Sequence, residues 1–116
     1  MEGLSKKKDF FRLFSQGKRV KVNSIKLWSL SQEEGSLRVV FVGRGKRAVD
    51  RNRVRRRLRE AFRIYYYPQW KDEAVDLLFM SNEKSLKMSF EDLVKDMGKA
   101  LEEVRVDEVK RESEAE

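Results

Sequence analysis

The sequence contains neither cysteine nor histidine, and these two absences exclude much of enzyme chemistry. Without cysteine there is no disulfide, no thiol nucleophile and no thiolate ligand for a metal. Without histidine the chain lacks the commonest general base and the usual imidazole ligand of transition metals. Acidic pairs such as Asp72/Glu73 have no distinctive spacing and are expected on solvated surfaces. We therefore expect no catalytic residue in this protein, and the sequence identifies no metal ligand.

Long apolar runs are also missing, since no segment approaches 18 consecutive apolar residues and the first residues are polar. These features predict a cytoplasmic protein with no membrane partner. The 116 residues are enough for one domain with a modest core, and hydrophobic residues (40%) scarcely balance charged ones (41%). We expect this domain to span 1–106, and 107–116 to be an acidic tail that is frayed or disordered.

What the chain has in excess is arginine, concentrated in residues 44–63, RGKRAVDRNRVRRRLREAFR. This stretch contains nine arginines and one lysine but only two acidic residues, Asp50 and Glu60. Its net charge is therefore +8, while the net charge of the whole chain is +7. Its apolar residues have the spacing of one helical stripe, with Asp50 placed as an N-cap and Pro68 after the last turn. The stripe, which we expect to be buried, consists of Val54, Leu58, Ala61, Phe62 and Tyr65.

Two interpretations of this charge compete. A solvated helix face normally mixes the two signs at i,i+4 spacing, whereas here Arg51, Arg55 and Arg59 follow one another and repel. Arginine also offers a planar fork that matches phosphate oxygens, which lysine does not. The pattern therefore favours a surface that binds nucleic acid.

The rest of the chain predicts alternating elements. A helix over 5–15 would place Leu4, Phe11 and Phe14 on one face, and Gly17 would end it as a C′ glycine. Strands are expected over 18–30 (broken near Asn23), 37–42 and 74–80, and residues after Pro68 are expected to form a loop. Ser89 is placed to cap a final helix. The order predicts an α+β fold, an α-β-β-β-α-β-α sandwich of helices on a four-stranded sheet.

The segment Arg51-Asn52-Arg53, continued by a basic helix, resembles the signature of the protein subunit of bacterial ribonuclease P. The likeness extends to the opening KKKDFFRLFSQGKRV and to the segments IKLWSLS, LRVVFVG and VDLLFM. It covers about residues 5–104. One departure is the link over 43–47, which is shorter than is usual in the family.

This resemblance implies an RNA-based endoribonuclease that removes the 5′ leader of precursor tRNA, with Mg²⁺-dependent catalysis by the RNA subunit. The protein would be an accessory with a left-handed β-α-β crossover and two RNA-binding surfaces. Residues that would bind the catalytic RNA are Lys46, Arg47, Arg51, Asn52, Arg53, Arg55, Arg56 and Arg59. Residues that would line a cleft for the precursor tRNA leader are Phe10, Phe14, Trp28, Lys21 and Lys26.

Other interpretations stay open at this stage. Phe10 and Phe14 could equally be core residues, as aromatic pairs at helical spacing usually are. A ribosomal or general structured-RNA-binding protein would show the same charge without any role in tRNA processing. A DNA-binding helix is disfavoured because no zipper or helix-turn-helix partner accompanies it. No protein partner is evident from the sequence.

Overall fold

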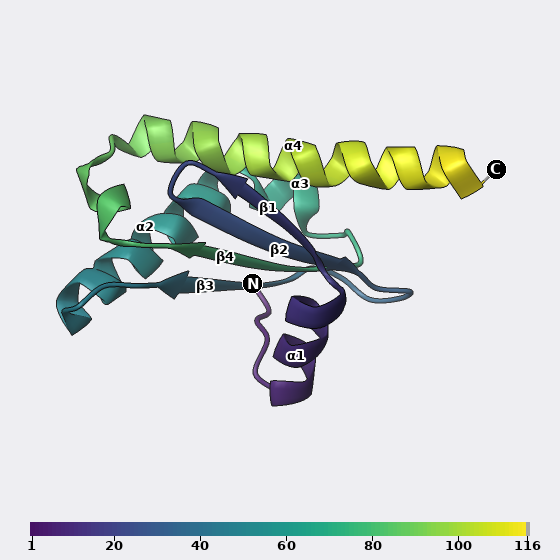
Figure 1. Ribbon diagram of the computed structural model, residues 1–116, viewed down its shortest axis with the longest axis horizontal. Coiled ribbons are helices and arrows are strands. Elements are labelled where there is room, and N and C mark those ends of the chain that lie inside the picture. The colour runs from purple at the N-terminus through teal and green to yellow at the C-terminus, as the bar shows by residue number, and fades with distance from the viewer. Residues whose placement is uncertain (116) are drawn as a thin grey trace.

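The computed structural model describes the backbone of residues 1–115 and the side chains of residues 1–105. At its centre is a sheet of β1 (Lys18–Val22), β2 (Ile25–Ser31), β3 (Arg38–Gly43) and β4 (Val75–Ser81). The strand order is β1-β2-β4-β3, so the last strand in sequence lies inside the sheet (Figure 1). β3 and β4 are parallel, and the other neighbours are antiparallel. The predicted α+β fold with four strands is confirmed.

Helices lie on both faces of this sheet (Figure 1). One face carries the long helices, while the first helix lies alone on the other. No helix in the described part of the chain is long and apolar enough to cross a membrane. The helices are α1 (Lys7–Gln16), α2 (Ala48–Tyr65), α3 (Tyr67–Trp70), the 3-10 helix η1 (Glu83–Lys87) and α4 (Phe90–Ala115).

The main core lies between the sheet and the pair α2 and α4. Three rings pack together here, and the distances between their centroids are 5.6 to 6.0 Å. They belong to Phe62 of α2, Phe41 of β3 and Phe79 of β4. The predicted stripe is confirmed from Val54 to Phe62, whose members are fully buried. Tyr65 departs from it and is half exposed, because α2 ends there and its ring meets only the edge of Phe90. Helix α2 thus buries its apolar side in the core, and its opposite side carries the exposed arginines.

A second, smaller core holds α1 on the opposite face of the sheet. Its buried members are Leu13 of α1, Leu4 and Leu78. The prediction that Phe11 shares the apolar face was wrong, since Phe11 is 74% exposed and Leu13 is completely buried. The reason is that the helix begins at Lys7 and rests on the sheet through Leu13, which turns Phe11 to solvent.

Two predicted helix boundaries were also wrong. Residue Arg47, not Asp50, precedes α2, so Asp50 lies inside the first turn, buried and paired with Arg47 at 2.8 Å. Pro68 does not introduce a loop, because Tyr67–Trp70 forms one helical turn with Pro68 in its first turn. Proline is accepted there because those amides have no partner within the helix.

Capping at the remaining helix ends follows local chemistry. Ser89 accepts a hydrogen bond from the amide of Asp92 at 3.1 Å, which confirms the predicted cap of α4. Gly17 ends α1, but its φ of −72° is not left-handed. Glycine is required because a Cβ would lie 2.9 Å from the carbonyl of Ser29 and still closer to that of Leu13. The prediction of a frayed or disordered tail over 107–116 stays a prediction, and the backbone of α4 continues to Ala115.

Candidate RNA-binding surfaces

The basic side chains of α2 and of the link before it form one exposed band, which we call the arginine surface. Every predicted RNA-subunit residue lies on it with its side chain exposed, while the apolar side of the same helix is in the core. The structure therefore brings these residues together as expected. The arginine surface consists of Lys46, Arg47, Arg51, Asn52, Arg53, Arg55, Arg56 and Arg59.

Part of the arginine surface is engaged in holding its own shape. Arg47 donates two hydrogen bonds to the Asp50 carboxylate, and this partner lowers the pKa of Asp50 below its ordinary value. Arg51 donates to the carbonyls of Gly45 and Lys46 at 2.9 and 3.1 Å, which folds the short link back onto α2. These two arginines are therefore preorganised by the protein.

Arg55 donates to Oδ1 of Asn52 at 3.3 Å, while four other cations of this surface make no such bond in the described structure. Within the described residues, Lys46, Arg53, Arg56 and Arg59 make no hydrogen bond or ion pair to the protein. Exposed guanidinium groups of one sign repel each other, so this arrangement costs stability unless an anion approaches. The surface is therefore built to receive a polyanion, and phosphate is the anion that suits a planar guanidinium fork.

Arg55 and Arg59 also face a groove of about 450 Å³ along the outer edge of β3. Its other walls include Met1, Gly3 and Phe41. The N-terminal segment covers part of that edge, since the amide of Val39 donates to the carbonyl of Glu2 at 2.8 Å. The arginine surface thus continues from the helix to the side of the sheet.

Arg57 has a different role, which the charge pattern alone does not distinguish from that of its neighbours. Its guanidinium donates to the carbonyls of Ser85 and Met88, the second at 2.8 Å, and its side chain is half-buried. These carbonyls lie at the end of η1, where the Ser85 carbonyl also accepts the amide of Met88 at 3.2 Å. Arg57 therefore ties α2 to the segment before α4, and sequence position on the apolar side of α2 was the only signal.

The opposite face of the sheet carries the predicted leader-binding residues. Strand register places Lys21 directly across from Lys26, and Arg19 across from Trp28. Like charges on facing positions of paired strands are destabilising, so the Lys21 and Lys26 pair again favours an anionic ligand. We call this face, where α1 leaves it uncovered, the α1 face; its side chains are Arg19, Lys21, Lys26, Trp28, Val42 and Met80.

Aromatic side chains stand at the border of α1 and this face. Phe14 meets Trp28 at 5.1 Å between ring centroids and stays 46% exposed, and the Arg19 guanidinium lies 5.8 Å from the Trp28 ring. Phe10 instead is half-buried against the small core around Leu13. Phe14 is thus the predicted aromatic that the structure leaves most exposed, whereas Phe10 and Trp28 are both half-buried against the small core.

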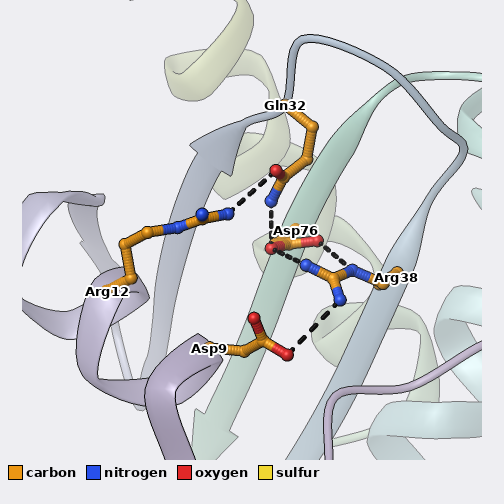
Figure 2. A network of polar contacts seen from close by, with 5 residues as sticks. All are labelled: Asp9, Arg12, Gln32, Arg38 and Asp76. Atoms are coloured by element: carbon orange, nitrogen blue, oxygen red, sulfur yellow. Dashed lines mark hydrogen bonds and ion pairs between the residues drawn. The ribbon is translucent and has the colours of Figure 1, made fainter. Parts of the chain in front are cut away.

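A polar network that the sequence patterns do not predict lies beneath this face (Figure 2). Asp76 lies in the central strand β4 with 1% exposure and is paired with Arg38 at 2.8 Å. An acidic residue inside the apolar run 74–80 was the available signal, because a buried carboxylate requires a partner.

The described residues include no group of three acidic side chains that could hold a metal ion. The buried carboxylates of Asp50 and Asp76 are each committed to an arginine. Neither of these two carboxylates is therefore open to a metal ion.

Comparison with known proteins shows similarity in both sequence pattern and fold. A family model described as Ribonuclease P matches residues 1–105. The solved structure of the Staphylococcus aureus RNase P protein is 19% identical, with a TM-score of 0.74 over 91% of this chain and 97% of that one. The Thermotoga maritima RNase P protein is 18% identical, with a TM-score of 0.69 over 84% and 92% of the two chains. At these identities the structures show the fold. No curated protein sequence matches the chain.

Proposed function

Since the chain belongs to the ribonuclease P protein family, we propose that it is an accessory subunit that binds a catalytic RNA and the 5′ leader of precursor tRNA. The family's holoenzyme is an endoribonuclease. In our proposal the arginine surface holds the catalytic RNA and the α1 face holds the leader, in the cytoplasm. The observation that carries it is the exposed arginine surface, whose members Arg53, Arg56 and Arg59 make no hydrogen bond or ion pair with the described residues.

The arginine surface would act on RNA phosphates. Each guanidinium that meets a phosphate releases condensed counterions, so affinity should fall steeply as salt rises. Arg47 and Arg51, already fixed by Asp50 and by the link carbonyls, would bind without losing further side-chain freedom. Arg53, Arg56 and Arg59 would gain their partner only on binding.

The α1 face would act on unpaired bases. Single-stranded RNA is bound by aromatic platforms that stack on bases and by cations that follow the phosphates. Trp28 and Phe14 supply the aromatic surface, and Lys21 and Lys26 supply the charge, on the opposite side of the sheet from α2. The two faces allow the catalytic RNA and the leader to be bound at once.

We propose that Mg²⁺ is held by the RNA, where it would supply the hydrolytic chemistry. The role of this chain would then be electrostatic. Cations on the arginine surface neutralise phosphates that otherwise repel one another, so the folded RNA would need less divalent ion.

The test is cleavage of a leader-bearing precursor tRNA by a bacterial ribonuclease P RNA at low Mg²⁺, with and without the protein. We expect strong stimulation by the wild type and little by an Arg53→Ala/Arg55→Ala variant. A Lys95→Ala/Lys99→Ala variant removes the same charge from exposed positions of α4 and should stimulate almost as well as wild type.

Two results would contradict the proposal. Tight RNA binding without any stimulation would indicate a general structured-RNA-binding protein. Cleavage by the protein alone, in the absence of the RNA subunit, would mean that the chain contains an active site of its own.

A further inference from the structure

A buried carboxylate in the central strand is connected to helix α1 by two polar arms (Figure 2). The carboxylate of Asp76 accepts hydrogen bonds from Nε and Nη2 of Arg38, both at 2.8 Å. The remaining nitrogen of that guanidinium, Nη1, reaches Oδ2 of Asp9 in α1 at 3.5 Å. The first arm therefore runs from β4 through β3 to the helix.

The second arm leaves the same carboxylate in the other direction. Gln32 donates its Nε2 to Oδ2 of Asp76, and its Oε1 accepts a hydrogen bond from Nη2 of Arg12 at 2.9 Å. Asp9 and Arg12 are three residues apart in α1, so both arms end on the same side of the helix. We call these five residues, Asp9, Arg12, Gln32, Arg38 and Asp76, the Asp76 network.

The arms exceed what Asp76 itself requires. Arg38 already pairs with both carboxylate oxygens, which is the strongest arrangement available to a buried acid. The links onward to Asp9 and Arg12 add nothing to that pairing and involve side chains of α1 that solvent could satisfy instead. Their consequence is to fix the helix relative to the sheet.

The orientation of helix α1 depends on such polar contacts because the helix buries few apolar side chains against the sheet. Among the described residues, its fully buried contact is Leu13, which packs with Leu4 and Leu78. Phe10 adds a half-buried contact to the same cluster. Apolar burial is non-directional, so these few contacts do not determine how the helix turns on the sheet. Hydrogen bonds to charged groups have defined geometry and supply that orientation.

We infer that the Asp76 network is a positioning device that holds α1 in the orientation in which Phe14 stands against Trp28 and the α1 face can accept single-stranded RNA. This inference rests on the proposed function for its ligand. The five residues act through Phe14 and Trp28, which are 5.1 Å apart at the border of the face. They are positioning residues and make no contact with RNA in this account.

The test uses the double variant Asp9→Ala/Gln32→Met in the full chain, which removes the acceptor at position 9 and the donor at position 32. It interrupts both arms and leaves the Arg38 and Asp76 pair intact, so the fold should survive. It also raises the net charge by one, which by itself strengthens RNA binding. Glu34→Gln is the matched control, because it raises the charge equally from an exposed turn that makes no ion pair in the described structure.

Two quantities are measured, amide hydrogen exchange along the chain and the affinities for leader-bearing and leaderless tRNA. We expect faster exchange in α1, unchanged exchange in the sheet, and a loss of about 3- to 10-fold in leader-dependent affinity. That range follows if the productive orientation of α1 falls to roughly a third or a tenth of the population. The Glu34→Gln protein should keep the wild-type preference for leader-bearing over leaderless tRNA, because its added charge strengthens binding of both forms alike. The double variant should bind leaderless tRNA as the Glu34→Gln protein does.

Unchanged exchange in α1 would overturn the inference directly. Faster exchange with an undiminished preference for leader-bearing tRNA would also overturn it, since the orientation of α1 would then be irrelevant to binding. A wild-type protein that binds both tRNA forms equally would instead remove the proposed leader site, and with it the role of the Asp76 network in RNA positioning.

Discussion

Phe14 of α1 and Trp28 of β2 meet edge to face, with an angle of 85° between ring planes and 5.1 Å between centroids. This ring contact joins α1 to β2 beside the small apolar core that lies on the same face of the sheet. Because Phe14 is still 46% exposed, the pair presents aromatic surface to solvent beside Lys26 and Arg19. Edge-to-face pairs are favourable in themselves, but an exposed one is better explained by a ligand than by stability.

Trp28→Ala should therefore weaken binding of leader-bearing tRNA much more than it changes stability. Loss of one stacked base costs about 1–3 kcal/mol, or roughly 5- to 150-fold in affinity. Filter binding with leader-bearing and leaderless tRNA measures the difference. Tyr65→Ala, which removes an exposed aromatic from α2, is the control. Equal losses for both variants, or for both tRNA forms, would contradict the assignment of the leader to the α1 face.

Neighbouring arginines of α2 should behave in opposite ways. Arg57→Met removes the guanidinium that donates to the carbonyls of Ser85 and Met88, and should destabilise the fold by about 1–3 kcal/mol. Arg56→Met, at an exposed position without a protein partner in the described structure, should leave stability unchanged and lower the salt dependence of RNA binding by about one phosphate contact. Urea unfolding and salt titration separate the two, and similar unfolding curves for both variants would contradict a structural role for Arg57.

Most of the fold follows from periodicity in the sequence, and the arginine surface follows with it. An apolar stripe on α2 fixes which side enters the core, so the remaining arginines must be exposed wherever the helix packs. The run 74–80 likewise predicts a strand covered on both faces, as β4 is. These features depend on local spacing, which the sequence contains.

The Asp76 network could not be predicted in the same way, because it depends on strand register. Arg38 lies across from Asp76 only because β3 pairs with β4 in parallel, and Gln32 approaches from the end of β2. Local spacing also misplaced Phe11, since the rotation of α1 is set by its contacts with the sheet. Partners distant in sequence decide these positions, and single-sequence patterns do not contain them.

Ionisation of Tyr66 should lower the free energy of unfolding at alkaline pH. Its hydroxyl donates to the carbonyl of Val94 at 2.5 Å, and burial, assisted by Glu102, raises the pKa of Tyr66 above its ordinary value. The fold thus favours the neutral phenol. Its stabilising contribution is complete below the pKa of an unfolded tyrosine, about 10, and is lost as pH rises through the higher folded value.

Tyr66→Phe should be less stable than wild type at pH 8 by about 1 kcal/mol, the usual contribution of one hydrogen bond. The difference should shrink as pH passes about 10, because the variant has no phenol to ionise at that position. Urea unfolding at several pH values measures it, with Tyr65→Phe as an exposed control. A constant difference from neutral to alkaline pH would mean that Tyr66 does not cause this loss of stability.

Gly43 is where β3 passes closest to α2, and an added methyl group there should separate them. A Cβ at Gly43 would overlap the carbonyl oxygen of Arg51, which belongs to helix backbone and cannot move aside. Gly43→Ala should therefore cost about 1–3 kcal/mol, as overpacking usually does. Gly45→Ala is the matched control, because its Cβ would meet only the flexible, exposed side chain of Glu83, with Cγ 2.8 Å away. Since Arg51 and the link before it belong to the arginine surface, Gly43→Ala should also weaken binding of the catalytic RNA, while Gly45→Ala should not. Thermal unfolding and RNA titration of the two variants decide this, and equal stability would show that the strand and helix are not in close contact.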